Sequence, residues 1–542
     1  MARLTGGQAL VQQLKKEGVE VIFALPGVQL DWAFDALYEE REHIRVIHTR
    51  HEQATSYMAD GYARASGQVG TCLVVPGPGL LNASAGLATA YACSSPVLCL
   101  TGQINSDLIG VGRGVLHEID RQLETIASVT KWAVRALRPE EIPGVVHEAF
   151  RLLKTGRPRP VEIEIPPDVL MAQGEVTLYE PAQGERPPGD PEVLEAAART
   201  LGQAEHPLIW AGGGVLSSGA WTELQELAEM LEAPVVMTSN GRGALPEAHY
   251  LAQVAPAGAE LLPSSDVVLA VGTRFVQPAT VSWGVQPHQT VIQMDAEAAE
   301  IGRNYKPTLG IVADAKAGLA ALTERLPRHI RRRESRREEL LTLKAHVAEG
   351  FAKDQHRAPF AQAIRAELPE DGILVSESTQ VGYWCNAGGF PVYQPRTFLT
   401  SGYQGTLGYG FATALGVQVA HPDRKVVSIN GDGGFMYNVQ ELATMKMHKI
   451  NVVVVVFADD AYGNVKRIQQ TQFGGRTIAS DLFNPDFVKL ADSFGVQGMR
   501  AQGPEELRAC LRKALADNAP ALIHVPVGPM PQWNFDMSRR FT

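Results

Sequence analysis

The sequence predicts an α/β protein made of three doubly wound domains, each built on a parallel sheet. Short runs of mostly β-branched residues end in Gly, Asp, Asn or Ser, and a helix-like segment follows each run. Continuous apolar strands that alternate with helices are typical of parallel sheets covered on both faces. The chain has 542 residues, and two turn-rich or charged stretches divide it into three parts of similar length. At about 150 residues per domain, this length suggests three or four domains, and the two stretches favour three.

The two dividing stretches set the expected domain limits. Residues 172–191 are dense in Pro and Gly, which break helices and strands. Residues 326–340 hold six arginines among glutamates, which indicates a solvated connection between domains, with an anion-binding patch as the alternative. We therefore expect domains at residues 1–180, 190–330 and 355–542.

The strands are expected where the apolar runs lie. These are residues 19–24, 71–75 and 97–101 in the first domain, 207–210, 235–238, 267–271 and 291–294 in the second, and 373–376, 425–429, 451–457 and 521–525 in the third. Ligands of doubly wound sheets bind beyond the carboxyl ends of the strands. The residues just after each run are therefore the candidates for chemistry.

Composition and length of the apolar runs exclude several classes of protein. Asp and Glu outnumber Lys and Arg by 59 to 49, which argues against a nucleic-acid partner held by a basic face. The longest apolar runs, such as 452–458, are too short to span a bilayer, and the first residues lack the apolar core of a signal peptide. The five cysteines have neither zinc nor disulfide spacing. We therefore expect a cytoplasmic protein without a membrane partner.

The strongest motif lies at the ends of two strands of the third domain. The run 425–429 leads into a glycine-rich turn that contains Asp432, and the run 451–457 leads to Asp459 and Asp460. Carboxylates at neighbouring strand ends can converge on one ion. Glycines in the first turn let the backbone approach a phosphate, and oxygen ligands beside a diphosphate favour Mg²⁺. The competing interpretation is a pair of ordinary turns in which Asp caps a helix. The glycines are Gly431, Gly433 and Gly434.

This motif resembles the signature of the thiamin diphosphate-dependent enzymes, and residues 438–444 (NVQELAT) are similar to the acetolactate synthase branch of that family. The family signature closes with two asparagines, where this chain has Ala458 and Asp459. The resemblance implies that Asp432, Asp459 and the backbone carbonyl of Ala461 bind Mg²⁺. Asp460 is the alternative to Asp459 as the second side-chain ligand of Mg²⁺.

The resemblance extends over all three domains. Residues 50–54 (RHEQA) match the segment that carries the family's cofactor-activating glutamate, which would be Glu52, and residues 76–79 and 100–103 match later turns of the same domain. The family implies a pyrimidine-binding first domain and a third domain that binds diphosphate and Mg²⁺. Glu52 would exchange a proton with the pyrimidine ring in a dry site. Taken alone, Glu52 is better explained as a solvent-facing residue in the first turn of a helix, and only the match as a whole favours catalysis.

Other cofactor contacts are implied by the same resemblance. In the loop 402–408, Leu407 would bend the cofactor and the carbonyl of Gly405 would accept from its amino group, although core packing is the common role of a leucine. Pro26 would lie at the cofactor-facing turn of the first domain. Gln380 would face the diphosphate.

Substrate-facing candidates come from two loops of the first domain. His117 aligns with a position that holds Gln in acetolactate synthases and His in simple 2-oxo acid decarboxylases. It would donate to a substrate carboxylate or carbonyl, or move a proton, and a purely structural histidine is the alternative. Gln29 is the second candidate.

The chain departs from acetolactate synthases at two places. After the second metal motif it has Lys466 and Arg467, with no tryptophan, and these cations would face an anionic substrate or solvent. The usual flavin-contacting residues are replaced, among them by Val276 and Gln277, and the three glycines 212–214 fit a tight strand–helix turn. We therefore do not expect bound FAD.

The leading hypothesis is a thiamin diphosphate- and Mg²⁺-dependent lyase or carboligase. It would decarboxylate a 2-oxo acid and pass the carbanion equivalent to an aldehyde or ketone. The family places Glu52 and Asp432 on neighbouring chains, so a homodimer is the minimum active unit and a tetramer also fits. One alternative is a lyase of 2-hydroxyacyl-CoA or oxalyl-CoA, with the tail 533–542 closing over the ligand. The other is a non-catalytic regulatory homologue.

Overall fold

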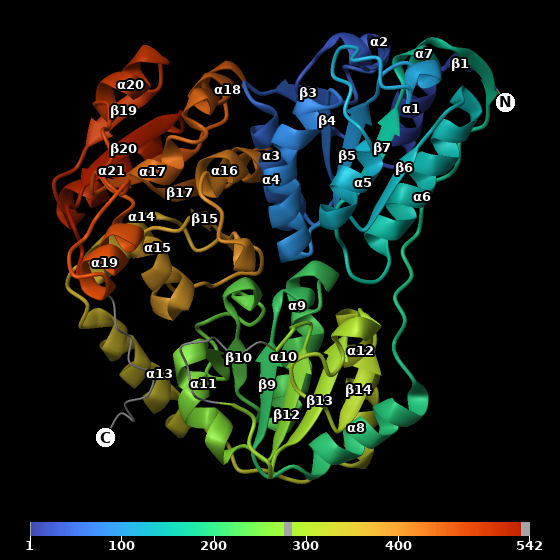
Figure 1. Ribbon diagram of the computed structural model, residues 1–542. Helices are drawn as coiled ribbons and strands as arrows, with labels where there is room; N and C mark the ends of the chain where they lie inside the picture. Colours follow the sequence, from blue (N-terminus) through green and yellow to red (C-terminus); the bar gives the residue numbers. More distant parts are fainter. Residues whose placement is uncertain (1, 276–283, 533–542) are drawn as a thin grey trace.

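The computed structural model describes residues 2–275 and 284–532 and contains three α/β domains (Figure 1). The first domain is blue to cyan, the central domain is green to yellow, and the third is orange to red. Each domain is built on a six-stranded sheet whose paired strands are all parallel. Helices cover the sheets on both faces. The predicted fold class is confirmed.

The first sheet has the strand order β3-β2-β4-β5-β7-β6. Its strands are β2 (Val21–Ala24), β3 (Arg45–His48), β4 (Gly70–Val74), β5 (Val97–Gly102), β6 (Trp132–Arg135) and β7 (Val161–Ile165). Its helices are α1 (Gly6–Lys16), α2 (Asp31–Glu39), α3 (Glu52–Ser66), α4 (Pro78–Cys93), α5 (Gln122–Ile126), α6 (Ile142–Lys154) and α7 (Pro167–Met171). An antiparallel ribbon of β1 (Ala2–Thr5) and β8 (Gln173–Val176) ties the start of the chain to the end of this domain.

The third sheet repeats the topology of the first, with the order β16-β15-β17-β18-β20-β19. Its strands are β15 (Ile373–Ser376), β16 (Phe398–Thr400), β17 (Val426–Gly431), β18 (Val453–Ala458), β19 (Gln497–Arg500) and β20 (Ala521–Pro526). Its helices are α14 (Ala358–Glu367), α15 (Gln380–Trp384), α16 (Tyr409–Ala420), α17 (Asp432–Phe435), α18 (Leu442–Met447), α19 (Gly463–Gln472), α20 (Phe487–Ser493) and α21 (Pro504–Asp517). The strand order reverses between β15 and β17, which is where such sheets bind ligands.

The central sheet has a different order, β11-β10-β9-β12-β13-β14. Its strands are β9 (Pro207–Ala211), β10 (Val235–Met237), β11 (Ala252–Val254), β12 (Val267–Val271), β13 (Thr290–Asp295) and β14 (Leu309–Val312). Its helices are α8 (Pro191–Gln203), α9 (Gly213–Ser218), α10 (Trp221–Leu231), α11 (Ala255–Leu261) and α12 (Ala315–Arg325), and α13 (Arg337–Ala352) leads to the third domain.

The arginine-rich connection serves the fold. Arg333 donates to the carbonyls of Leu201, Gly202 and Ala204 at the end of α8. Arg331 pairs with Glu205, which lies just after α8. These contacts tie the connection to the central domain and support the structural interpretation over an anion patch.

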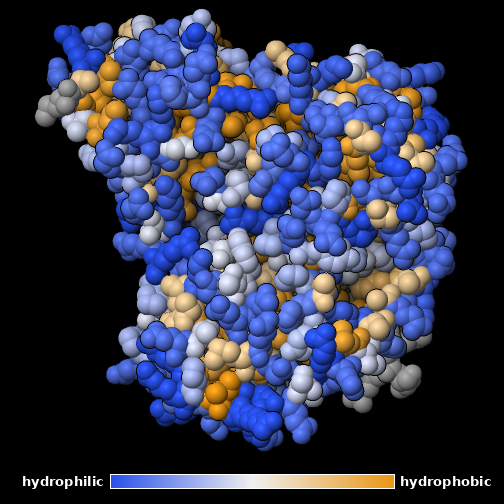
Figure 2. Space-filling model, turned by 180° about the vertical axis from the view of Figure 1, so that it is seen from behind, coloured by the Kyte–Doolittle hydropathy of each residue, from blue (hydrophilic) through white to orange (hydrophobic). Residues whose placement is uncertain are grey.

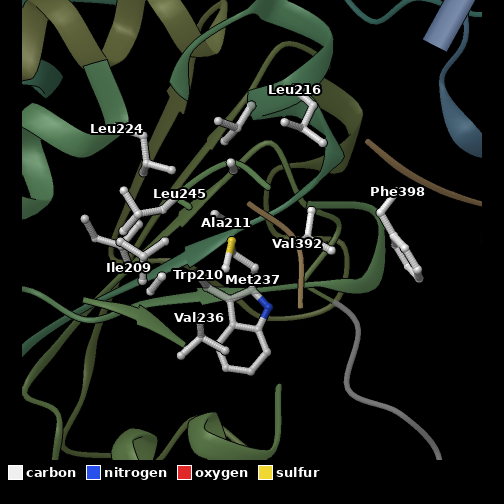
Figure 3. Packing of buried hydrophobic residues seen from close by; sticks show 14 of the residues in the cluster. Ile209, Trp210, Ala211, Leu216, Leu224, Val236, Met237, Leu245, Val392 and Phe398 are labelled. Carbon is white, nitrogen blue, oxygen red and sulfur yellow. The ribbon is translucent and has the colours of Figure 1, made fainter. Parts of the chain in front are cut away.

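The apolar core is continuous between the central and third domains. Figure 3 shows Val392 of the third domain near Met237 of the central domain, and Phe398 belongs to the same buried cluster. Arg242 of the central domain is fully buried and donates to the carbonyls of Cys385 and Phe390. The central domain is therefore docked firmly on the third.

The first and third domains meet along two helices that approach closely. A Cβ atom on Gly61 of α3 would overlap the carbonyl oxygen of Thr413 in α16, and one on Gly416 would overlap the carbonyl of Met58. Glycine is required at both crossing points because backbone occupies the side-chain positions. This contact fixes how α3 lies against the third domain.

Helix hydropathy and the state of the cysteines bear on the class of protein. Within residues 2–275 and 284–532, no helix is both long enough and apolar enough to cross a membrane. All five cysteines are free.

Candidate functional site

The two acidic turns of the third domain meet at one edge of the sheet. Gly431, the last residue of β17, lies opposite Phe457 of β18, so Asp432 and Asp459 follow neighbouring strand ends. This is the juxtaposition that the sequence predicts. Asp432 is buried, Asp459 is half-buried and Asp460 is exposed.

Asp432 and Asp460 make different hydrogen bonds. One Asp432 oxygen accepts from the backbone N–H of Gly433 at 3.0 Å. The other accepts from the N–H of Asp460 at 2.9 Å and from the side-chain amide of Asn484 at 2.7 Å. The same amide donates to the carboxylate of Asp460 at 2.7 Å. The side chain of Asp460 is thus directed to Asn484.

The electrostatics of Asp432 and Asp459 indicate a place for a cation. Burial raises the pKa of Asp432, and burial together with the charge of Asp432 raises the pKa of Asp459 to about 6. In the described part of the chain neither carboxylate has a Lys or Arg ion-pair partner. A divalent ion between the carboxylates would remove this repulsion.

Backbone oxygen is also available at this edge. Ala461 forms a bridge with Asp481, but the bonds of that bridge are donated by Tyr462 and Leu482. The bridge therefore does not use the carbonyl of Ala461. Among the described residues, no group of three or more His, Cys, Asp and Glu side chains is placed to hold a metal. A cation here needs backbone and ligand oxygens as well, which is usual for Mg²⁺.

The glycines of the first turn differ in their surroundings. A Cβ atom on Gly433 would lie 2.7 Å from the ring of Tyr462, and one on Gly434 would overlap a carboxylate oxygen of Glu377. At Gly431 the nearest atom is 3.8 Å from the Cβ position, so space is left there. The two inner glycines are required by packing, and Gly431 is free to face a ligand.

The loop 402–408 lies beside this turn. Gly405 is exposed with φ 59°, Leu407 is half-buried, and Gly408 has φ 82° where α16 begins. The Thr406 hydroxyl lies 3.1 Å from the Tyr57 hydroxyl of α3. The loop is therefore in contact with the first domain of the same chain.

Glu52 is the first residue of α3, and His51 caps the helix by accepting from the backbone N–H of Gln53. The role of His51 is thus structural. Glu52 is half-buried and accepts from the side-chain amide of Asn82 in α4 at 3.0 Å. The structure therefore places the Glu52 carboxylate beside Asn82.

His117 and Gln29 come together in the first domain. The Nδ1 atom of His117 lies 3.0 Å from the side-chain oxygen of Gln29, whose amide donates to the carbonyl of Leu116 at 3.1 Å. His117 has φ 67°, a strained conformation for this residue type, and such strain gathers at functional sites. Pro26 is exposed at the turn before Gln29. The two candidates form one polar pair on neighbouring loops.

A buried arginine fixes the side chain of Gln380. Its side-chain oxygen accepts from Arg357 at 2.9 Å, and Arg357 is buried and also paired with Asp354. The bond to Arg357 fixes the orientation of the Gln380 side chain. Lys466 and Arg467 on α19 pair with Asp481 and Asn464, so both cations have partners within the chain.

At the corresponding edge of the central sheet, backbone atoms pack directly against the glycine-rich turn. Cβ atoms on Gly212 and Gly214 would clash with Gly272, which follows β12. These glycines therefore serve close packing of a strand–helix turn. The guanidinium of Arg274 stacks 4.0 Å from the ring centre of Tyr403. Val276 and Gln277, used above to argue against FAD, and the tail 533–542 lie outside the described residues.

Sequence reasoning missed three residues of the site: Glu377, Asn484 and Asn82. Glu377 directly follows the strand 373–376, so the strand-end rule that found Asp432 also applies to it. Asn484 and Asn82 come from a loop and a helix surface, and no local pattern in the sequence identifies them.

Comparison with known proteins agrees with this geometry. Three models of the thiamine pyrophosphate enzyme family match the chain: the N-terminal binding domain at residues 4–124, the central domain at 194–322 and the C-terminal binding domain at 377–525.

The similar proteins align with nearly the full length of this chain. The chain is 38% identical to the probable acetolactate synthase large subunit of Methanocaldococcus jannaschii, over 97% of this chain and 92% of that protein. It is 34% identical to the acetolactate synthase of Arthrospira platensis (97% and 94%) and 34% identical to the probable 2-ketoarginine decarboxylase of Pseudomonas aeruginosa (96% and 94%). The chain therefore belongs to the thiamin diphosphate-dependent enzymes, in their acetolactate synthase-like group.

Proposed function

We propose that this enzyme uses thiamin diphosphate and Mg²⁺ to decarboxylate a small 2-oxo acid and to join the remaining unit to an aldehyde or ketone. The observation that carries the proposal is the pair of carboxylates, Asp432 and Asp459, at neighbouring strand ends of a full-length relative of acetolactate synthases. The regulatory alternative is set aside because these relatives are named as enzymes.

For the metal we propose Asp432, Asp459 and the carbonyl of Ala461 as ligands. The mutual repulsion of the two carboxylates fits a divalent ion between them. Asp460 is the weaker choice because its side chain is exposed and bonded to Asn484. The turn of Gly431, Gly433 and Gly434 would hold the diphosphate, with the amide of Gln380 beside it; this list follows the family resemblance.

When bound, thiamin diphosphate would supply a nucleophilic carbon for the substrate carbonyl and an electron sink for the decarboxylation. The protein's contribution is placement and proton transfer. We propose that Glu52, oriented by Asn82, holds and returns the proton of the pyrimidine ring. Leu407 would support the bent cofactor, while the carbonyl of Gly405 and the turn at Pro26 would flank the pyrimidine.

On the substrate side we propose His117 and Gln29 as one unit. The hydrogen bond to Gln29 engages Nδ1 of the imidazole, and we propose the other ring nitrogen for contact with substrate. A donor there would bind the carboxylate or carbonyl of a 2-oxo acid. Bound FAD has no part in this proposal.

The active enzyme is proposed to be a homodimer or a dimer of dimers. Large apolar side chains are exposed on both domains that carry the site, which favours a covering partner. They include Val28, Leu81, Leu116, Tyr437 and Phe483. Figure 2 shows apolar residues exposed among polar ones on one face of the molecule. Glu52 is only half-buried in the single chain, and a partner would complete the dry site that proton exchange needs.

The first experiment is proton NMR of the protein with thiamin diphosphate, Mg²⁺ and pyruvate. Acetolactate or acetoin is the expected product. Glu52→Gln is expected to lower turnover by about 100-fold or more while leaving cofactor binding intact, because it removes a positioned acid–base group. Glu20→Gln, at an exposed glutamate, is the control. Full turnover by Glu52→Gln would refute the assignment.

A simple decarboxylase is the second candidate. A relative named as a probable 2-ketoarginine decarboxylase and the histidine at position 117 favour it. Release of a free aldehyde without ligation in the NMR assay would select it. Untouched pyruvate would direct the assay to bulkier 2-oxo acids and then to acyl-CoA substrates, the remaining alternative.

A further inference from the structure

Glu377 is a buried glutamate that the proposed reaction does not use. It directly follows β15, at the point where the strand order of the third sheet reverses, and it is 1% exposed. One carboxylate oxygen accepts from the backbone N–H of Gly408 and the other from that of Gly410, both at 2.9 Å. These N–H groups open α16, so Glu377 caps a helix from a distant part of the chain.

The same carboxylate occupies space that two glycines leave free. A Cβ atom on Gly434 would overlap one oxygen of Glu377, and one on Gly410 would lie 2.9 Å from the other oxygen. Gly434 belongs to the turn after β17, while Gly408 ends the loop that contains Gly405 and Leu407. One side chain therefore contacts both segments that are assigned to the cofactor.

The charge of Glu377 is balanced by backbone dipoles. Among the ion pairs of the described residues none involves it. The N-terminus of α16 favours the carboxylate form, yet burial raises its pKa to about 7. Burial of a carboxyl group costs free energy. An apolar side chain cannot replace it here, because only an acceptor with two oxygens satisfies both N–H groups.

We propose that Glu377 is a positioning residue of the cofactor site, which holds the Gly405–Leu407 loop in register with the Gly431–Gly434 turn. The inference rests on the proposed function, since it takes both segments to bind one cofactor. Glu377 acts through these segments and touches neither cofactor nor substrate.

The test is the dissociation constant of thiamin diphosphate for Glu377→Gln, measured by calorimetry at saturating Mg²⁺. The amide keeps the shape of the side chain, but its NH₂ group must face one of the two backbone N–H groups. The loss of a charged hydrogen bond is expected to raise the dissociation constant by about tenfold or more. Circular dichroism establishes that the variant is folded at the temperature used.

Glu17→Gln is the matched control. Glu17 is another buried glutamate that accepts from a backbone N–H, that of Ala182, but it lies in the first domain away from the site. We expect Glu17→Gln to lower the melting temperature and to leave the dissociation constant unchanged. A merely structural Glu377 would behave in the same way.

Two more variants keep the proposal open to refutation. Gly434→Ala forces a methyl group against the carboxylate, so its effect on cofactor affinity should be non-additive with that of Glu377→Gln. If Glu377→Gln does not fold, Glu377→Asp takes its place, because the shorter side chain cannot reach both N–H groups. Folded Glu377 variants with wild-type affinity would overturn the inference alone. Wild-type protein that binds no thiamin diphosphate would overturn the proposed function with it.

Discussion

At the scale of single residues, Asp459 is the proposed second side-chain ligand of the metal, and its half-buried carboxylate is repelled by that of Asp432. Two anionic ligands hold a divalent cation more tightly than one carboxylate and one amide. Asp459→Asn is therefore expected to weaken Mn²⁺ binding by about tenfold, measured by electron paramagnetic resonance of free Mn²⁺.

Asp460→Asn is the matched control for that measurement. It removes the same charge one residue later, from an exposed side chain bonded to Asn484. A smaller effect than that of Asp459→Asn is expected. The reverse order would assign the second ligand position to Asp460.

The site residues show what sequence can and cannot predict at this scale. Asp432 and Asp459 were predictable because each follows an apolar strand, and the register of β17 and β18 then brings them together. Asn484 was not predictable. It lies in a loop without a periodic pattern, and its hydrogen bond to Asp432 joins residues 52 positions apart. The sequence named His117 and Gln29 as separate candidates. Their hydrogen bond depends on loop conformation, which the sequence does not predict.

At the scale of elements, many strands with an unbroken apolar run were predictable, while the short uncharged strands β11, β14 and β16 and the strands with charges were missed. The runs 267–271 and 373–376 match β12 and β15 residue for residue. The strand β7 was missed because Glu162 and Glu164 interrupt it, although both are fully buried. Their carboxylates are held by Thr101, Gln103, Gln122 and Arg135. Only these tertiary contacts make a buried strand of that sequence possible.

The crossing of α3 and α16 gives the prediction at this scale. Gly416→Ala places a methyl group on the carbonyl of Met58, so the helices must move apart. We expect a loss of about 1–3 kcal/mol in the free energy of unfolding, seen as a lower melting temperature. Gly144→Ala in α6 is the control, because its nearest neighbour is 3.6 Å away; it should be neutral or slightly stabilising. Equal stability of the two variants would show that the helices are not in tight contact.

At the scale of the whole molecule, the joint between the first and third domains contains two histidines. The rings of His48 and His448 lie 5.0 Å apart, and Arg45 donates to the carbonyl of His448. Burial, and then the charges of His48 and Arg45, lower the pKa of His448 to about 4. The folded joint therefore resists protonation of His448.

This shift predicts acid sensitivity. A lowered histidine pKa contributes stability that is complete above about pH 6.5 and is lost as the pH falls toward 4, because the unfolded chain binds the proton first. His448→Gln should reduce the loss in free energy of unfolding between pH 7.5 and 5.0 by about 1 kcal/mol after allowance for partial exposure, seen as a smaller drop in melting temperature. His206→Gln in the central domain is the control. An unchanged pH dependence in His448→Gln would remove this joint as the cause.

The domain limits 1–180, 190–330 and 355–542 stay predictions, although the three sheets occupy residues 21–165, 207–312 and 373–526. A limit is defined by independent folding, and the shared core of the central and third domains argues that these two depend on each other.

Assembly gives the last prediction, since Glu52 and Asp432 lie in different domains and the structure places Glu52 beside Asn82. If each site takes Glu52 from one chain and Asp432 from its partner, then Glu52→Gln and Asp432→Asn homodimers are both inactive. A hybrid of the two chains has one site with both defects and one intact site. Co-expression with random pairing should therefore restore about a quarter of wild-type turnover. Size-exclusion chromatography with light scattering fixes the oligomeric state of each sample. A folded dimeric mixture without restored turnover would place both residues of a site on one chain, because every hybrid site would then carry one defect.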